Sequence, residues 1–347
     1  MERITLSVHP KDAAAKILKA VSHKRTEDIL ARRFGLKGGR RHTLESIGKS
    51  YDITRERVRQ IEEAALKTLS ENPAAQVELA SLAPILKNHL MNHGGVSEER
   101  RFFESIADSK YHPHVHFLLA LGKPVLRTEE DGEHHNRWHV NEEVLKKAET
   151  AIRSAMDELD KKKTVVSENE LLDTINRHAK EVFGETKDHK SLRSYMGITK
   201  LIGKNPYGEY GLVTWPEINP RGVKDKAYAV LAKAGKPLHF VDIAKLINKT
   251  GWSKKSAHPQ TVHNELIKDN RFVLVGRGLY ALATWGYEPG TVSDVLVSIL
   301  QKTGQPLSKE EIARRVLEKR LVKENTVFLN LQDKKRFKKV EGGYTLV

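Results

Sequence analysis

The sequence contains no cysteine among its 347 residues. Disulfide bonds and thiolate metal sites are therefore excluded, and the absence of cysteine agrees with a reducing compartment. No apolar run approaches the roughly 18 residues that a membrane helix requires. The most apolar stretch, residues 116–126, is interrupted by Gly122, Lys123 and Pro124. The N-terminus MERITLSVHPKDAA also lacks the apolar core of a signal peptide. We therefore expect a soluble intracellular protein without a membrane partner.

Aromatic residues are scarce, at 6% of the chain, and apolar residues make up only 39%. We therefore expect small, mostly aliphatic cores, and a chain of this length predicts two or more domains. Lysine and arginine are abundant, 60 residues against 45 acidic ones, which gives a net charge of +15. Such an excess predicts a polyanionic partner, with nucleic acid first and an anionic membrane surface second.

The positive charge is concentrated at the two ends of the chain. Residues 1–72 carry a net charge of +6 and residues 223–347 carry +11, whereas residues 73–222 carry −2. This distribution indicates two contact regions joined by a neutral spacer rather than a uniformly charged surface.

The second half contains a repeat that is visible once the turns are aligned. Residues 227–251 and 295–319 each read as two helices separated by a Gly-x-Pro-Leu break. A third candidate helix follows each pair, at 259–269 and 324–334. Each repeat closes with apolar stretches around a glycine turn, which predicts hairpins at 271–282 and 336–347. Three helices and a hairpin predict a winged helix. Ser308 and Glu311 have the spacing of a capping box at the second helix of the last repeat.

The middle of the chain follows the same order more loosely, with turns expected at Asp131-Gly132 and Tyr207-Gly208. "PEINPRG" (216–222) has the composition of a linker. We predict a mainly α fold with small β-hairpin wings, in which a helix-turn-helix is followed by tandem winged-helix domains. The expected domains are 1–72, 73–144, 145–218, 223–287 and 288–347.

The stretch "TLESIGKSYDITRERVRQIEEAALKTL" (43–69) predicts two helices joined by a tight turn. Gly48 is small where the helices would cross, Asp52 tolerates a left-handed turn conformation, and Thr54 is a good N-cap. On a helical wheel, Val58 and Ile61 fall on one side of the second helix, whereas the polar side chains of residues 56, 59, 60 and 63 point the other way. A solvated face with helical charge pairs is the alternative to a DNA-reading surface.

Region 4 of housekeeping bacterial sigma factors closely resembles this segment, from about "RTEDILARRFGL" (25–36) through residue 69. The run Thr-Arg-Glu-Arg-Val-Arg-Gln-Ile-Glu at 54–62 carries the likeness. The resemblance implies recognition of a promoter −35 element in double-stranded DNA by Arg55, Glu56, Arg59 and Gln60. It also implies a contact with the flap of the β subunit in the RNA polymerase core. We expect Arg57, at the edge of the same face, to contact phosphate.

Two departures from that family change the expected function. The segment lies near the N-terminus, whereas region 4 ends a sigma factor, and the aromatic-rich region that opens the −10 element has no counterpart here. We therefore expect a regulator rather than a complete sigma factor.

Residues 223–287 resemble the HARE-HTH winged-helix domain, which occurs in the δ subunit of RNA polymerase, in chromatin proteins and in restriction endonucleases. The likeness rests on Gly235-Lys236-Pro237-Leu238 and Arg277-Gly278-Leu279-Tyr280. The resemblance implies a DNA-associated or polymerase-associated role and carries over no catalytic residue. The long acidic tail of the δ subunit is absent.

Two further side-chain clusters have competing interpretations. We expect phosphate contacts from the basic cluster between the last helix and its wing: Lys334, Lys335, Arg336, Lys338 and Lys339. His112, His114 and His116 alternate, and His134, His135 and His139 follow; we interpret them as a polar helix or wing surface, with a metal site as the alternative. Glycine-rich nucleotide loops, nucleophile elbows and His-Glu-x-x-His helices are absent from the sequence, so we predict no enzyme, cofactor or metal.

The sequence therefore predicts a cytoplasmic, nucleoid-associated transcription regulator that binds DNA and bacterial RNA polymerase. The main alternative is an interaction protein that binds RNA polymerase without reading DNA. A DNA-recognition accessory of a restriction or modification system is the weaker one. The target sequence, activation versus repression and the oligomeric state are left open.

Overall fold

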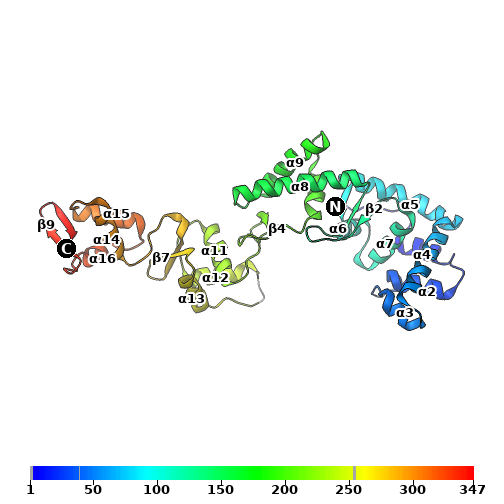
Figure 1. The fold of residues 1–347 in the computed structure, drawn as a ribbon, viewed down its shortest axis with the longest axis horizontal. Coiled ribbons are helices and arrows are strands. Elements are labelled where there is room, and N and C mark those ends of the chain that lie inside the picture. The colour runs from blue at the N-terminus through cyan, green and yellow to red at the C-terminus, as the bar shows by residue number, and fades with distance from the viewer. Residues whose placement is uncertain (1–2, 39, 253–254) are drawn as a thin grey trace. The chain divides into compact units, whose positions relative to one another are not determined.

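The computed structural model describes residues 3–38, 40–252 and 255–347. These residues form 16 α-helices and ten short strands in small antiparallel sheets (Figure 1). The mainly helical fold with small hairpins that the sequence predicts is therefore confirmed. Within the described ranges, no helix combines the length and apolar content needed to cross a bilayer.

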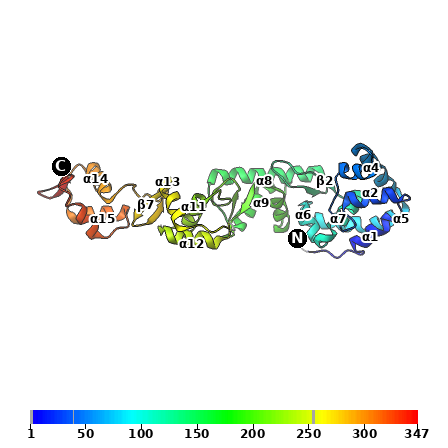
Figure 2. The same cartoon turned by 90° about the horizontal axis from the view of Figure 1, so that it is seen from below.

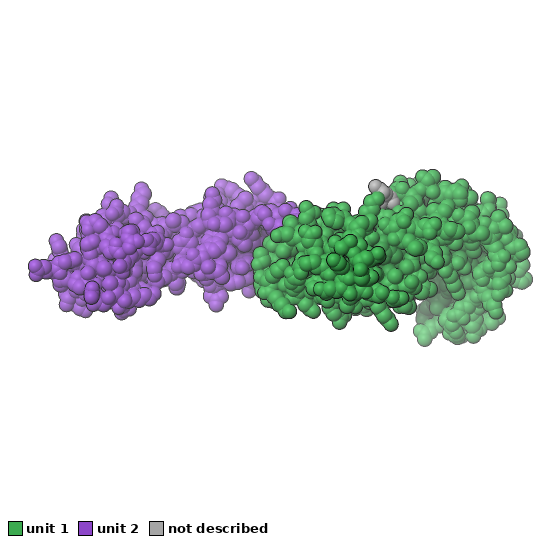
Figure 3. All heavy atoms as spheres, turned by 90° about the horizontal axis from the view of Figure 1, so that it is seen from above, with its two compact units in different colours: residues 1–202 green, residues 203–347 purple. Residues whose placement is uncertain are grey.

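The chain divides into two compact units, Met1–Ile202 and Gly203–Val347 (Figure 3). The first unit begins with four helices: α1 (Pro10–Leu18), α2 (Lys24–Phe34), α3 (Leu44–Tyr51) and α4 (Arg55–Glu71). Ile29, Ile47 and Val58 form a small aliphatic core between α2, α3 and α4. Side chains of α1, α2 and α4 also share a second core with the helices that follow, so these four helices do not stand apart from their neighbours.

The next segment has the element order of a winged helix. It contains α5 (Pro73–Met91), β1 (Val96–Glu98), α6 (Glu99–Ile106), α7 (His112–Gly122), β2 (Leu126–Thr128) and β3 (Arg137–His139). The three strands pair antiparallel in the order β1-β3-β2. Phe102, Phe103 and Trp138 are buried in the core beneath this sheet.

Three helices and a hairpin follow: α8 (Glu142–Lys162), α9 (Glu168–Phe183), α10 (His189–Ile198), β4 (Ile202–Lys204) and β5 (Tyr210–Leu212). α8 and α9 lie side by side (Figure 1 and Figure 2). α10 is attached to the preceding segment, because the Ser194 hydroxyl donates to the Val96 carbonyl at 2.6 Å and Tyr195 donates to Gly94 at 2.9 Å. The hairpin turns at Gly208, as the sequence predicts.

The second unit contains two further segments with the winged-helix order. The first has α11 (Val223–Ala234), β6 (Leu238–His239), α12 (Phe240–Thr250), α13 (Pro259–Lys268), β7 (Phe272–Gly276) and β8 (Leu279–Leu282). The second has α14 (Val292–Thr303), α15 (Lys309–Lys319), α16 (Glu324–Asn330), β9 (Phe337–Val340) and β10 (Gly343–Leu346). In this last segment the first strand is reduced to one bridge, in which the backbones of Leu307 and Tyr344 exchange two hydrogen bonds.

The capping box expected at α15 is only half formed. The Ser308 hydroxyl accepts from the Glu311 amide at 3.1 Å, but the Glu311 carboxylate pairs with Arg314 and Arg315 instead of returning to the cap. Those two arginines follow Glu311 at helical spacings that place them on the same face, so they compete for its carboxylate. Complete capping boxes occur elsewhere, at Ser167 with Glu170 and at Thr291 with Asp294.

The two winged segments of the second unit are joined by hydrogen bonds. The amide of Leu321 donates to the Val275 carbonyl on β7 at 2.9 Å. The guanidinium of Arg320, a residue only 5% exposed, donates to the carbonyls of Leu274 at 2.6 Å and Glu288 at 3.2 Å. These bonds fix the chain after α15 along the β7 edge of the preceding sheet.

Candidate nucleic-acid interface

The turn between α3 and α4 has the backbone geometry that its residues predict. Asp52 adopts a left-handed conformation with φ 53° and ψ 46°. A Cβ atom on Gly48 would lie 2.6 Å from the Ile53 carbonyl oxygen, so only glycine allows the chain to pass this close. The Thr54 hydroxyl then caps α4 by accepting from the Arg57 amide at 3.1 Å. The helix-turn-helix is therefore fixed by three local requirements.

The first two turns of α4 present polar side chains outward. Val58 is fully buried and holds the inner face of the helix. All four side chains that the resemblance assigns to base reading are exposed: Arg55, Glu56, Arg59 and Gln60. They come from the N-terminal end of the second helix, which is the part that a helix-turn-helix presents to the major groove.

Two carboxylates hold the Arg59 side chain. Its guanidinium pairs with Glu56 at 2.6 Å and also with Glu63, one helical turn on either side. The hydrogen bond from Arg59 lowers the pKa of Glu56, and the same bond raises the pKa of Arg59. All three groups are solvent-exposed, and exposed helical ion pairs are weak, so a base edge can replace these carboxylates.

The other polar residues of this face differ in how many hydrogen bonds they already make within the protein. Arg57 donates from Nη1 to the Gln60 side-chain oxygen at 3.2 Å. The Gln60 side chain also hydrogen-bonds to the Glu56 carboxylate and contributes to the lowered pKa of Glu56. The Arg55 side chain has no hydrogen bond or ion pair to any residue that the structure describes. Arg55 is therefore the candidate base reader that has no hydrogen bond or ion pair to break before it contacts a base.

Contacts around Tyr51 position α2 beside the turn and could not be read from the sequence. The guanidinium groups of Arg25 and Arg32 lie 5.0 Å and 5.7 Å from the Tyr51 ring centre, and the Tyr51 hydroxyl donates to Asp28 at 2.6 Å. Arg25 remains exposed next to the C-terminal end of α3. These α2 residues lie far from Tyr51 in the sequence, so no local spacing signals this arrangement.

The basic cluster near the C-terminus is only partly brought together. Lys334 and Lys335 are exposed in the turn before β9, and within the described chain no carboxylate lies within 4.0 Å of either ammonium group. Arg336 instead pairs with Asp294 at 3.2 Å. Lys338 and Lys339 are neighbours on β9, and successive side chains of a strand point to opposite faces. These last two lysines therefore cannot face one surface.

The interpretation of the histidines as a polar surface is wrong for half of the group. His114 is 6% exposed, His134 is 8% exposed and His139 is fully buried. His114 is buried because α7 lies between two hydrophobic cores. His139 is buried because it lies on β3, the central strand of the β1-β3-β2 sheet. Among the residues that the structure describes, no three His, Asp or Glu side chains converge as metal ligands would.

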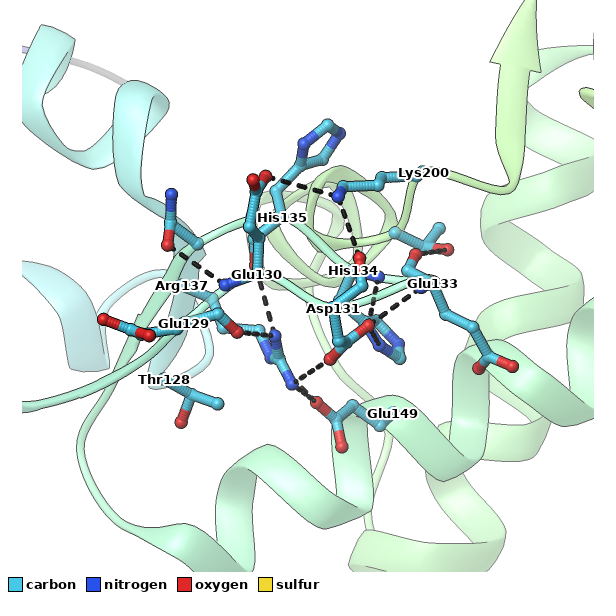
Figure 4. A network of polar contacts seen from close by, with 12 residues as sticks. Thr128, Glu129, Glu130, Asp131, Glu133, His134, His135, Arg137, Glu149 and Lys200 are labelled. Carbon is cyan, nitrogen blue, oxygen red and sulfur yellow. Dashed lines mark hydrogen bonds and ion pairs between the residues drawn. The ribbon is translucent and has the colours of Figure 1, made fainter.

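A polar network holds the loop between β2 and β3 in place (Figure 4). Arg137, only 4% exposed, donates to Asp131 at 3.0 Å, to Glu149 of α8 at 2.9 Å and to the Glu129 carbonyl at 3.0 Å. Burial opposes ionisation of Asp131, but hydrogen bonds from the Glu133 and His134 amides hold its pKa below the ordinary value. Lys200 donates to the Asp131 carbonyl at 2.9 Å. This wing is therefore tied to its own unit.

Residues 23–71 match the family Sigma-70, region 4. Residues 221–285 match the HARE-HTH family, a helix-turn-helix domain named after ASXL and restriction endonucleases among others. Both resemblances inferred from the sequence are thereby confirmed, and residues 23–71 are called the region-4 segment below.

Sequence relatives match the region-4 segment over short stretches. The RNA polymerase sigma factor SigA of Lactococcus lactis subsp. cremoris is 58% identical over 45 residues, which are 13% of this chain and 12% of that protein. SigA of Clostridium acetobutylicum is 48% identical over 69 residues, 17% of this chain and 18% of the relative. The chain thus spans less than a fifth of the length of these sigma factors.

Proposed function

We propose that this chain is a DNA-binding transcription regulator that works with bacterial RNA polymerase and reads a −35-like element through α4. The observation that carries the proposal is an intact helix-turn-helix whose recognition helix exposes Arg55, Glu56, Arg59 and Gln60 together. Arginine can pair with guanine, glutamine with adenine, and glutamate can accept from cytosine. The match of this segment to sigma-70 region 4 supports a promoter element as the target.

In this proposal the remaining basic residues hold the DNA backbone. Arg57 would contact phosphate beside the recognition face, and the second unit would add contacts from Lys334, Lys335, Arg336 and one of the two β9 lysines, Lys338 or Lys339. Phosphate contacts fix register and orientation but carry no sequence information. Sequence preference should therefore depend on α4, and salt-dependent affinity should depend on both ends of the chain.

The decisive experiment compares a −35-like duplex with a scrambled duplex at one salt concentration. We expect Arg59→Ala combined with Gln60→Ala to reduce discrimination between the duplexes roughly tenfold or more, since each good base contact contributes specificity of this order. Arg314→Ala is the matched control, because Arg314 on α15 pairs with Glu311 and Glu318 at the same helical spacings as Arg59 with Glu56 and Glu63. The control should keep full discrimination; a double variant that discriminates as well as the parent would refute the assignment.

A groove on the region-4 segment supports a contact with RNA polymerase. It has a volume of about 270 Å³ and is lined by residues 20–22, which precede that segment, by His23 and Thr26, and by one side of α4: Ile61, Ala64, Ala65, Thr68 and Leu69. This mostly apolar surface is formed by other residues than the four proposed base readers. We propose that it takes the flap of the polymerase β subunit, the partner that the region-4 resemblance implies.

Thr68→Arg tests the polymerase contact, because Thr68 is exposed and its replacement puts a charged side chain in the groove. We expect the variant to lose co-purification with core polymerase while its preference for the −35-like duplex is kept. If the chain is instead an interaction protein that does not read DNA, the parent will bind polymerase but will not distinguish the duplexes. Unchanged co-purification of the variant would exclude the groove as the docking site.

We further propose that the chain acts beside a sigma factor and does not replace one. Its match spans only 12–18% of the sigma relatives. Run-off transcription from a linear promoter with core polymerase and this protein alone should therefore give no transcript. A transcript in the absence of any other sigma factor would contradict this proposal. A role beside a restriction system rests on the description of the second matched family and stays the weaker alternative.

A further inference from the structure

A pocket of about 400 Å³ lies within the first unit, where α2 and α4 approach α7, β2 and β3. This volume is within the range of about 300–1,000 Å³ that small-molecule sites occupy. Its lining comes from both the helix-turn-helix and the winged segment that follows, and no proposed base reader contributes to it. The pocket is therefore separate from the DNA-reading face.

One part of the pocket wall is apolar and partly aromatic. Leu119, Val125 and Trp138 are nearly fully buried behind it, whereas Leu126 is 45% exposed. The His116 ring lies between two aromatic neighbours, with its centre 5.5 Å from that of Phe34 and 5.9 Å from that of Trp138. Such a wall favours a ligand with an apolar or aromatic body.

Three guanidinium groups from distant parts of the chain line the same pocket. Arg33 is held by Glu62 at 3.0 Å, and Arg127 is held by Glu99 at 2.6 Å. Arg41, by contrast, is exposed, and within the described ranges no carboxylate lies within 4.0 Å of it. The pocket thus offers one uncommitted guanidinium beside two that are already positioned by acids.

His116 adds a polar atom to this wall whose hydrogen-bonding capacity is unused. Its Nδ1 is shielded from solvent and has no hydrogen-bond partner among the described residues. Burial lowers the pKa of His116 to about 3, and the nearby charges of Arg41, Arg127 and Arg33 act in the same direction. The ring is therefore neutral at physiological pH, and the positive charge of the pocket belongs to the arginines.

We propose that this pocket binds a small organic anion, with its phosphate or carboxylate group on Arg41, Arg33 and Arg127 and its apolar body against Leu126 and the His116–Trp138 wall. The planar guanidinium of arginine pairs equally well with phosphate and with carboxylate. The geometry therefore indicates that the ligand has a negative charge and an apolar body, and leaves both acid groups open.

The test measures binding of five probes to the full-length protein by calorimetry at constant ionic strength. Phenyl phosphate, AMP and benzoate carry both an anion and an aromatic body, whereas inorganic phosphate and phenol each carry one of the two. We expect saturable one-to-one binding of at least one aromatic anion, at least tenfold tighter than inorganic phosphate or phenol. Preference for phenyl phosphate or AMP over benzoate would identify a phosphate ligand, and the reverse a carboxylate.

Variants separate the pocket from general surface charge. Arg41→Ala should weaken binding of the preferred probe at least tenfold, and Arg40→Ala, a neighbouring exposed arginine that does not line the pocket, should leave it unchanged. Leu126→Asp is the second variant, for the case that Arg41→Ala folds poorly. It places a negative charge at an exposed position of the wall and should also weaken binding of the preferred probe at least tenfold. Absence of saturable binding by every aromatic anion, or equal binding by both pocket variants and the parent, would overturn the proposal. Because no DNA is present, failure here would leave the DNA-reading proposal intact.

Discussion

Gly48 and Asp52 control the approach of α3 to α4 at the residue scale. Asp52 reverses the chain in a left-handed conformation, which a short polar side chain tolerates better than most. Gly48 then allows the Ile53 carbonyl to come so close that a methyl group would meet it at 2.6 Å. Because the obstacle is backbone, it cannot move without changing the angle between the two helices.

We expect Gly48→Ala to destabilise the protein although alanine is the better helix former. The helical preference favours alanine by about 0.5–1 kcal/mol, whereas forcing extra volume into a packed contact costs about 1–3 kcal/mol. Gly197→Ala is the matched control, because Gly197 is also within a helix, α10, and its added methyl would meet only the flexible end of Arg101. Urea unfolding of the full chain should show a lower midpoint for Gly48→Ala and an equal or higher one for Gly197→Ala. Equal midpoints for the two variants would mean that the close approach at Gly48 has no energetic consequence.

The residues of the turn were predictable from the sequence, and the histidines were not. Gly48, Asp52 and Thr54 respond to local geometry, so their neighbours in sequence are enough to predict their roles. The environment of His114 and His139 depends on two cores built from residues far along the chain. The arginines of the anion pocket, Arg33, Arg41 and Arg127, likewise meet only through tertiary packing.

At the scale of elements, the two winged segments of the second unit are joined by a contact between the repeats that is not part of either repeat. The sequence predicts its helices and hairpins, because glycine turns and apolar periodicity are local signals. It does not reveal that Arg320 and Leu321, at the end of α15, bond to the β7 edge of the earlier segment. Ion pairs of Glu288 with Lys302 at 3.0 Å and with Lys319 strengthen the same junction. The two repeats therefore act as one structural body within this unit.

Arg320→Ala should weaken that junction. The change removes two hydrogen bonds from a charged donor, and a hydrogen bond to a charged group contributes about 1.5–3 kcal/mol. Both bonds come from Nη1 of Arg320, so Arg320→Lys keeps a charged donor but loses the planar group that positions it, and we expect an intermediate loss. Thermal unfolding and limited proteolysis between residues 283 and 292 would report the change. Protease resistance and melting equal to the parent in Arg320→Ala would show that the junction does not depend on this side chain.

At the scale of the whole molecule, binding of a polyanion depends less on the net charge than on which basic side chains are already paired with acids. The lysines at 161–163 lie in the neutral middle, where Lys162 pairs with Glu158 at 2.7 Å and Lys163 with Asp160 at 2.5 Å. Lys334 and Lys335 have no such partners within the described chain. A polyanion therefore gains more from the second cluster, because no existing ion pair has to be broken.

We expect replacement of Lys334, Lys335, Lys338 and Lys339 by glutamine to weaken binding to all duplexes alike. Each neutralised phosphate releases condensed counterions, so log affinity falls with log salt by about 0.9 per contact. Lys338 and Lys339 point to opposite faces of β9, so at most three of the four should contact one duplex, and the salt slope should become shallower by roughly 1 to 3. The same replacement at Lys161, Lys162 and Lys163 is the control and should leave the slope unchanged.

The point variants are preferable to deleting residues 288–347, because that deletion also removes Arg320 and Leu321 from the β7 edge. Preference for the −35-like duplex should survive in both sets, since α4 is untouched. A slope that is the same in the parent and in the C-terminal variant would remove the last winged segment from the DNA-binding surface.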